Sequence, residues 1–342
     1  MRSSILIIYT GGTIGMKTDD ATGALVPFDF SGIYDEFPSL KRLNVDIDVL
    51  TMSPVIDSSN VEPSNWAALA GLIRDNYARY DGFVVLHGTD TMSYTASALS
   101  FMLENLAKPV VFTGSQIPIG VLRTDGRENL ITAIEIAGAR IGDRPEVPEV
   151  SLYFQNRLFR ANRTKKHSAE ELSAFASHNY PALADVGVGI HYRYGAICRC
   201  DAGKTFSVNT AVSQDVAVVK IFPGMTEPVF RAMLSAEGVR GVVLETYGAG
   251  NAPTFGWFIG ALEEAISRGV HVLNVTQCVS GSVNMDIYET GRRLQEAGVI
   301  SGRDITTEAA LAKMMCLLGR GCGTAEFVEL MRHSVRGEMT EE

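Results

Sequence analysis

Short apolar runs alternate with longer amphipathic stretches along this chain, and this alternation limits the folds that it can adopt. In the first half, residues 4–9, 47–52, 83–86 and 110–113 have the length and composition of buried strands. Residues 63–80, 91–106 and 125–141 repeat apolar side chains every three or four positions, as amphipathic helices do. The alternation favours parallel strands, because each helix returns the chain across a face of the sheet. The sequence therefore predicts an α/β fold with a mostly parallel sheet flanked by helices.

A second alternation of the same kind follows in the last third of the chain. Residues 216–221, 239–245 and 270–275 are expected as strands, and residues 226–236, 253–268, 307–318 and 325–332 as helices. The polar segment 201–214 separates the two series. The length of 342 residues also exceeds the ~250 to 300 at which single cores stop growing. We expect a larger N-terminal α/β domain over residues 1–200, a linker over 201–214 and a smaller C-terminal α/β domain over 215–342.

The charge balance and the cysteine content exclude several classes of partner. A net charge of −9 opposes binding to nucleic acid or anionic membranes, since both need a basic surface. The N-terminal apolar run in MRSSILIIYTGG is shorter than the ~7 to 15 residues of a secretory signal or the ~20 of a membrane span. The five cysteines form no disulfide framework, and no Cys or His pairs have the spacing of a zinc site. We expect a cytoplasmic protein with no membrane, nucleic-acid or metal partner.

Small polar residues follow each of the four predicted N-terminal strands. Ligands of open α/β sheets bind beyond the carboxyl ends of the strands, so these segments are candidates for a site. They are residues 10–15 (TGGTIG), 57–60 (DSSN), 87–91 (HGTDT) and 114–116 (GSQ). One alone would be read as a tight turn or a helix cap, but four at adjacent strand ends indicate a ligand site. The first segment lacks the spacing of a nucleotide-binding loop, so no nucleotide cofactor is expected.

The residue types in these segments suit a small amino acid derivative. Asp90 can accept an ammonium group, and the hydroxyls and amides of residues 57–59 can hold an α-carboxylate. A threonine hydroxyl can attack the ligand's side chain, but it is a weak nucleophile and needs a base. His87 is the one histidine placed for this role, and a neutral lysine is the alternative. Lysines occur in the basic run 156–167, NRLFRANRTKKH, which charge alone would assign to a solvated face.

Six short motifs together resemble the cytosolic type I branch of the L-asparaginase family. They are TGGTIGM, DSS, HGTDTM, TGSQIP, NRTKK and YGAGNAP, and the similarity extends over nearly the whole chain. The resemblance implies two α/β domains, with each active site built between the N-terminal domain of one subunit and the C-terminal domain of its partner. It implies a homodimer or a dimer of dimers that hydrolyses L-asparagine to L-aspartate and ammonia without a metal or a cofactor.

The resemblance also implies roles for the residues at matching positions. Thr13 would be the nucleophile that forms a β-aspartyl ester, although the sequence leaves open which threonine attacks. Thr89, Asp90 and Lys166 would form a second catalytic set, in which Lys166 draws a proton from Thr89. The residues implied to bind the substrate are Asp57, Ser58, Ser59, Gly88, Asp90 and, from the neighbouring subunit, Asn251.

The segment after the first motif departs from the family pattern. Many relatives place a tyrosine in this lid close to the nucleophile, whereas residues 17–27 here read KTDDATGALVP. Tyr288, in NMDIYETG, is the candidate substitute from the C-terminal domain. Gly23 and the small polar residues around it still suit a mobile cover over the substrate.

A second departure concerns regulation. Some bacterial members of this branch bind a regulatory asparagine through an arginine just before the Y-G-x-G-N-A-P motif and a threonine beside the catalytic lysine. Glu245 and Lys165 occupy those two positions here, while Thr276 and Cys278 retain another part of the site. A glutamate repels the carboxylate that an arginine binds with two hydrogen bonds, and a lysine is only a point charge. We therefore expect hyperbolic rather than sigmoidal kinetics with asparagine.

Three alternatives to an asparaginase stay open at this point. The first is an amidohydrolase that prefers glutamine, and the second is a subunit of a tRNA-dependent amidotransferase. The latter usually bears an extra N-terminal domain and needs a tRNA partner, which an acidic chain disfavours. The third is an amino acid sensor without catalysis, which would be expected to lose its nucleophile or its lysine. Thr13, Thr89, Asp90 and Lys166 are all present, which favours an enzyme.

Overall fold

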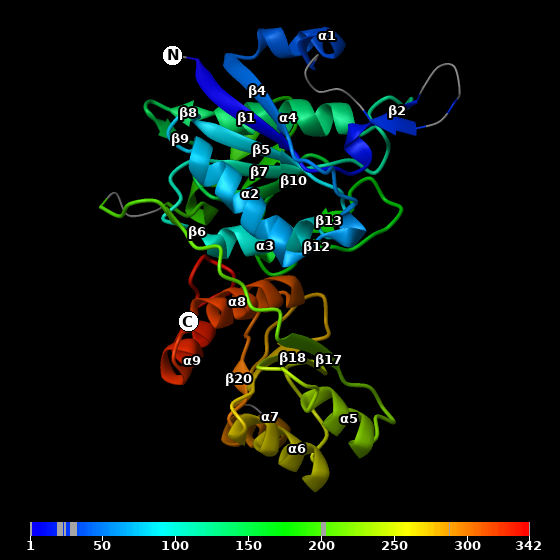
Figure 1. Ribbon diagram of the computed structural model, residues 1–342, viewed down its shortest axis with the longest axis vertical. Helices are drawn as coiled ribbons and strands as arrows, with labels where there is room; N and C mark the ends of the chain where they lie inside the picture. Colours follow the sequence, from blue (N-terminus) through cyan, green and yellow to red (C-terminus); the bar gives the residue numbers. More distant parts are fainter. Residues whose placement is uncertain are drawn as a thin grey trace. The chain divides into compact units, whose positions relative to one another are not determined.

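The structure is a computed structural model that describes residues 2–18, 23, 25–27, 33–199, 203–286 and 288–341 (Figure 1). The chain divides into two compact units, Met1–Asn209 and Thr210–Glu342. The division falls inside the polar segment 201–214. Each unit has a sheet and helices of its own, and the two are described in turn.

The first unit is built on an eight-stranded sheet with the order β15-β14-β11-β10-β7-β5-β1-β4. Five neighbouring strands are parallel: β4 (Val45–Thr51), β1 (Ser3–Tyr9), β5 (Gly82–Leu86), β7 (Val110–Thr113) and β10 (Val150–Phe154). The other three are antiparallel: β11 (Arg157–Arg160), β14 (Ala184–Val186) and β15 (Ile190–Tyr192). The predicted α/β fold with a mostly parallel sheet is therefore confirmed.

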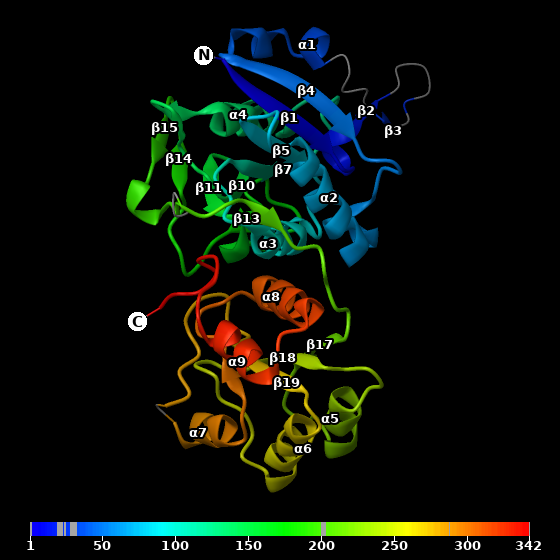
Figure 2. The ribbon, with the colours of Figure 1, turned by 60° about the vertical axis from the view of Figure 1, so that its left-hand side comes forward.

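Helices cover both faces of this sheet. Figure 1 shows α2 (Pro63–Asn76) and α3 (Met92–Met102) in front of the strands and α4 (Gly126–Gly138) behind them, and Figure 2 gives a second view. Leu130 and Ile134 of α4 share one buried cluster with Ile5 and Ile7 of β1. Side chains alternate along a strand, so the remaining residues of β1 face the other side. Burial on both faces explains why β1, β5 and β7 are mostly apolar, whereas β4 at the edge of the sheet carries Asp46 and Asp48.

The three predicted helices exist but end three to four residues earlier than periodicity suggested. The antiparallel strands were not predicted. β10 and β11 are joined by Gln155 and Asn156, which both have positive φ, at 43° and 67°. This is the conformation of a two-residue hairpin turn, but the usual Asn-Gly or Asp-Gly signal is absent from the sequence.

Short elements complete the first unit. They are β2 (Met16–Thr18) and β3 (Leu25–Pro27), which pair with each other, β6 (Leu103–Glu104) with β16 (Ser207–Val208), β8 (Arg140–Ile141) with β9 (Arg144–Pro145), β12 (Lys165–Lys166) with β13 (Phe175–Ala176), and helix α1 (Ile33–Glu36). β2 and β3 frame the lid expected over residues 17–27. Within that lid, residues 19–22 and 24 lie outside the described residues.

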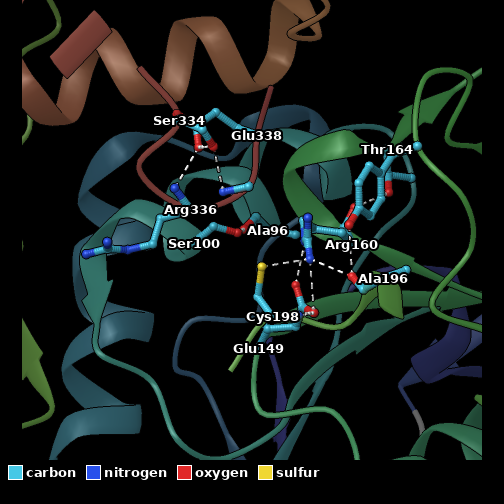
Figure 3. A network of polar contacts seen from close by, with 12 residues as sticks. Ala96, Ser100, Glu149, Arg160, Thr164, Ala196, Cys198, Ser334, Arg336 and Glu338 are labelled. Atoms are coloured by element: carbon cyan, nitrogen blue, oxygen red, sulfur yellow. Dashed lines mark hydrogen bonds and ion pairs between the residues drawn. The ribbon is translucent and has the colours of Figure 1, made fainter. Parts of the chain in front are cut away.

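Part of the basic run 156–167 is buried rather than solvated. Arg160 is 2% exposed, and its Nε donates to Glu149 Oε2 at 2.7 Å (Figure 3). Its Nη2 reaches the carbonyl of Ala196 at 2.8 Å and the Sγ of Cys198 at 2.9 Å. A buried guanidinium needs several acceptors, and this one ties β11 to two distant segments of the same unit.

The second unit contains a parallel four-stranded sheet with the order β17-β18-β19-β20. Its strands are β17 (Val216–Lys220), β18 (Gly241–Thr246), β19 (His271–Thr276) and β20 (Ile300–Ser301). Its helices are α5 (Glu227–Leu234), α6 (Gly256–Ser267), α7 (Glu289–Glu296), α8 (Thr307–Arg320) and α9 (Thr324–Arg332). α5 and α6 share one buried cluster with the sheet, and α8 and α9 share another. The sequence predicted all of these elements except α7 and β20.

An internal ion pair fixes the end of the second unit. Lys313 of α8 lies 2.6 Å from Glu338, with side chains 1% and 0% exposed, and it also donates to the carbonyl of His333. Glu338 accepts the backbone amides of Val335 and Arg336, so its charge is compensated from several sides. No helix in the described ranges of the chain combines the length and apolar content needed to cross a membrane.

Candidate active site

Three of the four polar turns of the first unit meet around one cavity. β4, β1, β5 and β7 are adjacent and parallel, so the turns that follow them emerge at the same edge of the sheet. β1 pairs with β4 on one side and β5 on the other, which makes it the point where the strand order reverses. The cavity measures about 390 Å³ and is lined by Tyr9, Gly12, Thr13, Met16, Val55, Ile56, Asp57, Ser58, Gly88, Thr89 and Asp90.

Two glycines allow the turns of β1 and β5 to touch. Gly12 has a φ of +92°, and a Cβ on it would lie 2.4 Å from the Cα and 2.5 Å from the N of Gly88. A Cβ on Gly88 would in turn meet Ser58 Oγ at 2.5 Å. Neither position accepts a side chain without moving backbone or a site residue. This close contact sets Thr13 and Thr89, one residue further along each turn, on the wall of the same cavity.

Lys166 reaches the turn of β5 from the antiparallel part of the unit. It lies in β12, and its Nζ is 2.9 Å from Thr89 Oγ1 and 2.8 Å from Asp90 Oδ1. Its side chain is 19% exposed, so this lysine does not belong to a solvated basic face. The contacts join a hydroxyl, an amine and a carboxylate that are 76 and 77 positions apart in the sequence.

Gln116 is a site residue whose role the sequence did not indicate. Its Nε2 donates to the carbonyls of Ala169 and Glu171 at 3.2 Å each, which directs Oε1 toward Thr89. Thr89 Oγ1 donates to that oxygen at 3.2 Å while it accepts from Lys166. The hydroxyl proton therefore has a defined acceptor and an oxygen lone pair faces the amine. The GSQ segment after β7 was the only sequence signal.

His87 is not placed to act as the base. Its imidazole is 3% exposed, and Nδ1 lies 2.7 Å from the carbonyl oxygen of Gly88. Burial lowers the pKa of His87 to about 4, so the ring is neutral at physiological pH. A neutral ring with Nδ1 protonated donates to Gly88 and holds the turn that carries Thr89. Of the two bases that the sequence allowed, only the lysine contacts a threonine hydroxyl.

The turn after β4 contributes a carboxylate and a hydroxyl. Asp57 Oδ1 accepts the amide and the hydroxyl of Ser59, both at 2.9 Å. These hydrogen bonds lower the pKa of Asp57, so it stays ionised. Ser58 is 4% exposed, and its carbonyl accepts the hydroxyl of Thr91 at 2.6 Å. Asp57 and Ser58 line the cavity, and Ser59 orients the carboxylate of Asp57 by its hydrogen bonds.

Asn251 and Tyr288, the two site candidates of the C-terminal half, lie in the second unit. Asn251 follows β18, and its Oδ1 accepts the hydroxyl of Thr290 at 2.7 Å. It lines a separate cavity of about 460 Å³ whose other lining residues include five aromatic ones, Phe222, Tyr247, Phe255, Trp257 and Phe258. Tyr288 precedes the first residue of α7 and is 53% exposed.

Four residues were considered for a regulatory site: Glu245, Lys165, Thr276 and Cys278. Glu245, Thr276 and Cys278 make hydrogen bonds within the second unit, and Lys165 lies in a strand of the first. Glu245 Oε1 accepts the hydroxyl of Thr307 at 2.6 Å, and Oε2 lies 3.9 Å from Lys220 Nζ. Thr276 donates to the carbonyl of Gly248 at 2.6 Å and accepts the amide of Cys278. Lys165 lies in β12 beside Lys166. The carboxylate of Glu245 is therefore already engaged within the second unit.

Comparisons with known proteins assign both units to one family. Residues 4–197 match the family description "Asparaginase, N-terminal", and residues 215–331 match "Glutaminase/Asparaginase C-terminal domain". L-asparaginase 1 of Escherichia coli is 43% identical over 340 residues, covering 99% of this chain and 98% of the relative. The 60 kDa lysophospholipase of Homo sapiens is 40% identical, covering 98% of this chain and 61% of the relative. The crystal structure of L-asparaginase I from Vibrio cholerae matches with a TM-score of 0.91 at 42% identity, over the full length of both chains.

The close contact between the turns of β1 and β5 can be tested by adding a methyl group at Gly12. Gly12→Ala is expected to destabilise the protein by at least about 2 kcal/mol, because the methyl group meets backbone atoms and the positive φ is strained. Gly71→Ala is the matched control, since only Arg74 Nη2 lies near its Cβ, at 3.9 Å, and alanine favours the helix. Denaturant unfolding of both variants measures the difference. A Gly12→Ala variant as stable as the control would contradict the contact.

Proposed function

The chain belongs to the asparaginase family, and we therefore propose that it hydrolyses L-asparagine to L-aspartate and ammonia. One observation carries the proposal. Thr13 and Thr89 line a single cavity, and Lys166 contacts the hydroxyl of Thr89. The two threonine hydroxyls and the lysine amine that contacts one of them supply a nucleophile and a proton acceptor for cleavage of a side-chain amide. The likeness to L-asparaginase 1 over 99% of this chain supports the choice of substrate.

In the first step, the hydroxyl oxygen of Thr13 attacks the carboxamide carbon of the substrate. A C–O bond forms, the carbonyl oxygen takes up negative charge, and backbone N–H groups around Gly88 and Thr89 stabilise that charge. The C–N bond then breaks, and the amide nitrogen leaves as ammonia with the proton that the threonine lost. The product is a β-aspartyl ester on Thr13. Water cleaves this ester in the second step, which releases L-aspartate and restores the hydroxyl.

Thr89, Asp90 and Lys166 assist both steps. Lys166 draws the proton from Thr89 once the hydroxyl, which donates to Gln116 in the structure, turns toward the amine. The Thr89 oxygen then accepts a proton from the attacking group, and Lys166 passes its proton to the leaving group. Gln116 holds the Thr89 hydroxyl in one orientation before the transfer. The remaining Asp90 oxygen accepts the ammonium group of the substrate, since its side chain is 62% exposed.

The substrate's amino acid head binds at the turn after β4. Asp57 and Ser58 line the cavity beside Asp90, and Ser59 keeps Asp57 oriented. Asn251 completes the site from the neighbouring subunit of a homodimer or a dimer of dimers. Thr290 fixes its amide oxygen, which leaves the amide nitrogen for the substrate. The enzyme acts in the cytoplasm, where reduced cysteines are the norm.

The substrate preference is the first test. We expect kcat/KM for L-asparagine to exceed that for L-glutamine at least about tenfold, because a pocket that fixes both ends of the amino acid penalises one more methylene by ~1 to 3 kcal/mol. Ammonia release from each amide under the same conditions gives the ratio. Equal efficiency would support the glutamine-preferring alternative, and no release from either would remove the proposal.

The catalytic set is the second test. Thr13→Ala, Thr89→Val and Lys166→Met should each lower kcat at least about a thousandfold, the usual scale when one member of a nucleophile–base set is lost. Lys165→Met is the matched control, because it removes the neighbouring lysine and leaves the contact with Thr89 intact. A Lys166→Met enzyme that keeps more than about a tenth of the activity would show that this amine takes no part in the reaction.

Subunit complementation tests the role of Asn251. Thr13→Ala and Asn251→Ala chains should each be nearly inactive alone. Mixed, dissociated and reassembled at equal amounts, they should recover about a quarter of the wild-type activity, because half of the dimers are hybrids with one intact site. No recovery, with hybrids demonstrated by mass, would mean that each chain completes its own site.

A further inference from the structure

Tyr9 lies at the junction between the sheet and the cavity. It is the last residue of β1, and its side chain is 3% exposed. It belongs to the buried cluster that contains Ile7 and Ile14, and it also lines the cavity together with Thr13. The ring is therefore in contact both with the core of the first unit and with the wall of the proposed site.

The phenol of Tyr9 fills the space next to Gly15. A Cβ on Gly15 would lie 2.0 Å from the hydroxyl oxygen of Tyr9 and 2.1 Å from its Cζ. Gly15 is the last residue of the single 3-10 turn Thr13–Gly15. The tyrosine ring is thus packed directly against the backbone of the turn that begins with the proposed nucleophile.

Besides the buried side chain of Ile14, only local backbone contacts and the neighbouring tyrosine ring are seen to support this turn in the described part of the chain. Two backbone hydrogen bonds close it, one from the amide of Gly15 to the carbonyl of Gly12 at 3.1 Å and one from the amide of Met16 to the carbonyl of Thr13. It is preceded by Gly11 and Gly12, both with positive φ and without side chains that could anchor it. A rigid ring fixed in the core on one side and in contact with Gly15 on the other limits the positions that the turn can take.

We propose that Tyr9 is a positioning residue for Thr13, and that it holds the turn Thr13–Gly15 through its contact with Gly15. The inference rests on the proposed function, in which Thr13 is the nucleophile. A displacement of a nucleophile by about 1 Å can cost on the order of a hundredfold in rate, so support of this kind acts on kcat. Burial raises the pKa of Tyr9, so its phenol stays neutral beside a cavity where negative charge develops.

The decisive experiment is a double-mutant cycle between positions 9 and 15. Gly15→Ala drives a methyl group into the ring, and we expect kcat to fall at least about a hundredfold with KM changed less than about threefold. Tyr9→Leu removes the support, and kcat should fall at least about tenfold. In the double variant the methyl group occupies space that the ring has left, so kcat should recover at least about tenfold over Gly15→Ala alone.

Tyr153→Leu is the matched control. Tyr153 is another core tyrosine in the same unit, 2% exposed, with a pKa that burial also raises, but it does not line the cavity. Both Tyr→Leu changes should lower the midpoint of thermal unfolding, and only Tyr9→Leu should lower kcat. A Tyr9→Leu enzyme with wild-type kcat, or a Gly15→Ala enzyme that Tyr9→Leu fails to rescue, would overturn the inference.

The unfolding midpoints distinguish a failure of the inference about Tyr9 from a failure of the proposed function. Wild-type protein that releases no ammonia from asparagine would refute the proposed function alone. Additive shifts in the midpoints of the two single variants and the double variant would refute the contact between Tyr9 and Gly15, whatever the activity. A Gly15→Ala midpoint that rises when Tyr9→Leu is added would support it.

Discussion

The approach of two backbone turns is the constraint on which the site depends. Gly12 and Gly88 follow neighbouring parallel strands, and a Cβ on Gly12 would lie 2.4 Å from the Cα of Gly88. Adjacent strands are about 4.8 Å apart, so turns without side chains at these positions can close to contact. Each glycine is followed directly by a threonine, and both threonines line the cavity. The proposed chemistry uses two hydroxyls near one substrate, and this contact is what brings them together.

The second half of the site comes from a different kind of structure. Lys166 is carried by a two-residue strand outside the large sheet, beyond the antiparallel hairpin β10–β11. The arrangement of this region depends on the buried Arg160 with its acceptors Glu149, Ala196 and Cys198 (Figure 3). Charge alone would place the basic run 156–167 on a solvated face, but part of it is buried. Burial is possible because Arg160 donates to a carboxylate and a carbonyl that would otherwise lack hydrogen-bond partners. The lysine further along the run can then be directed toward Thr89.

The directions of its hydrogen bonds define how the Thr89 hydroxyl is oriented. Thr89 accepts from Lys166 and donates to Gln116, and Gln116 is oriented by two backbone carbonyls. The same turn is held from inside by a neutral His87, which donates to the carbonyl of Gly88. Gln116 and His87, which transfer no proton in the proposed reaction, thus orient the turn and the hydroxyl that does. The support that we infer for Thr13 from Tyr9 is of the same kind, with packing in place of hydrogen bonds.

Most of the helices and strands, and the edge of the sheet where a site could lie, can be predicted from the sequence. The strands β1, β5 and β7 are mostly apolar and β4 alternates apolar and polar residues, and such patterns are local properties of the sequence that need no tertiary information. The motifs TGGTIGM and HGTDTM also indicated Thr13 and Thr89 as candidate catalytic residues. Three features become visible in the folded chain alone: the base that contacts a hydroxyl, the orientation of Thr89 by Gln116 and the packing of Tyr9 on Gly15. The partners in the first of these contacts are 77 positions apart, and side-chain contacts across such separations depend on strand order, register and packing, which periodicity does not encode.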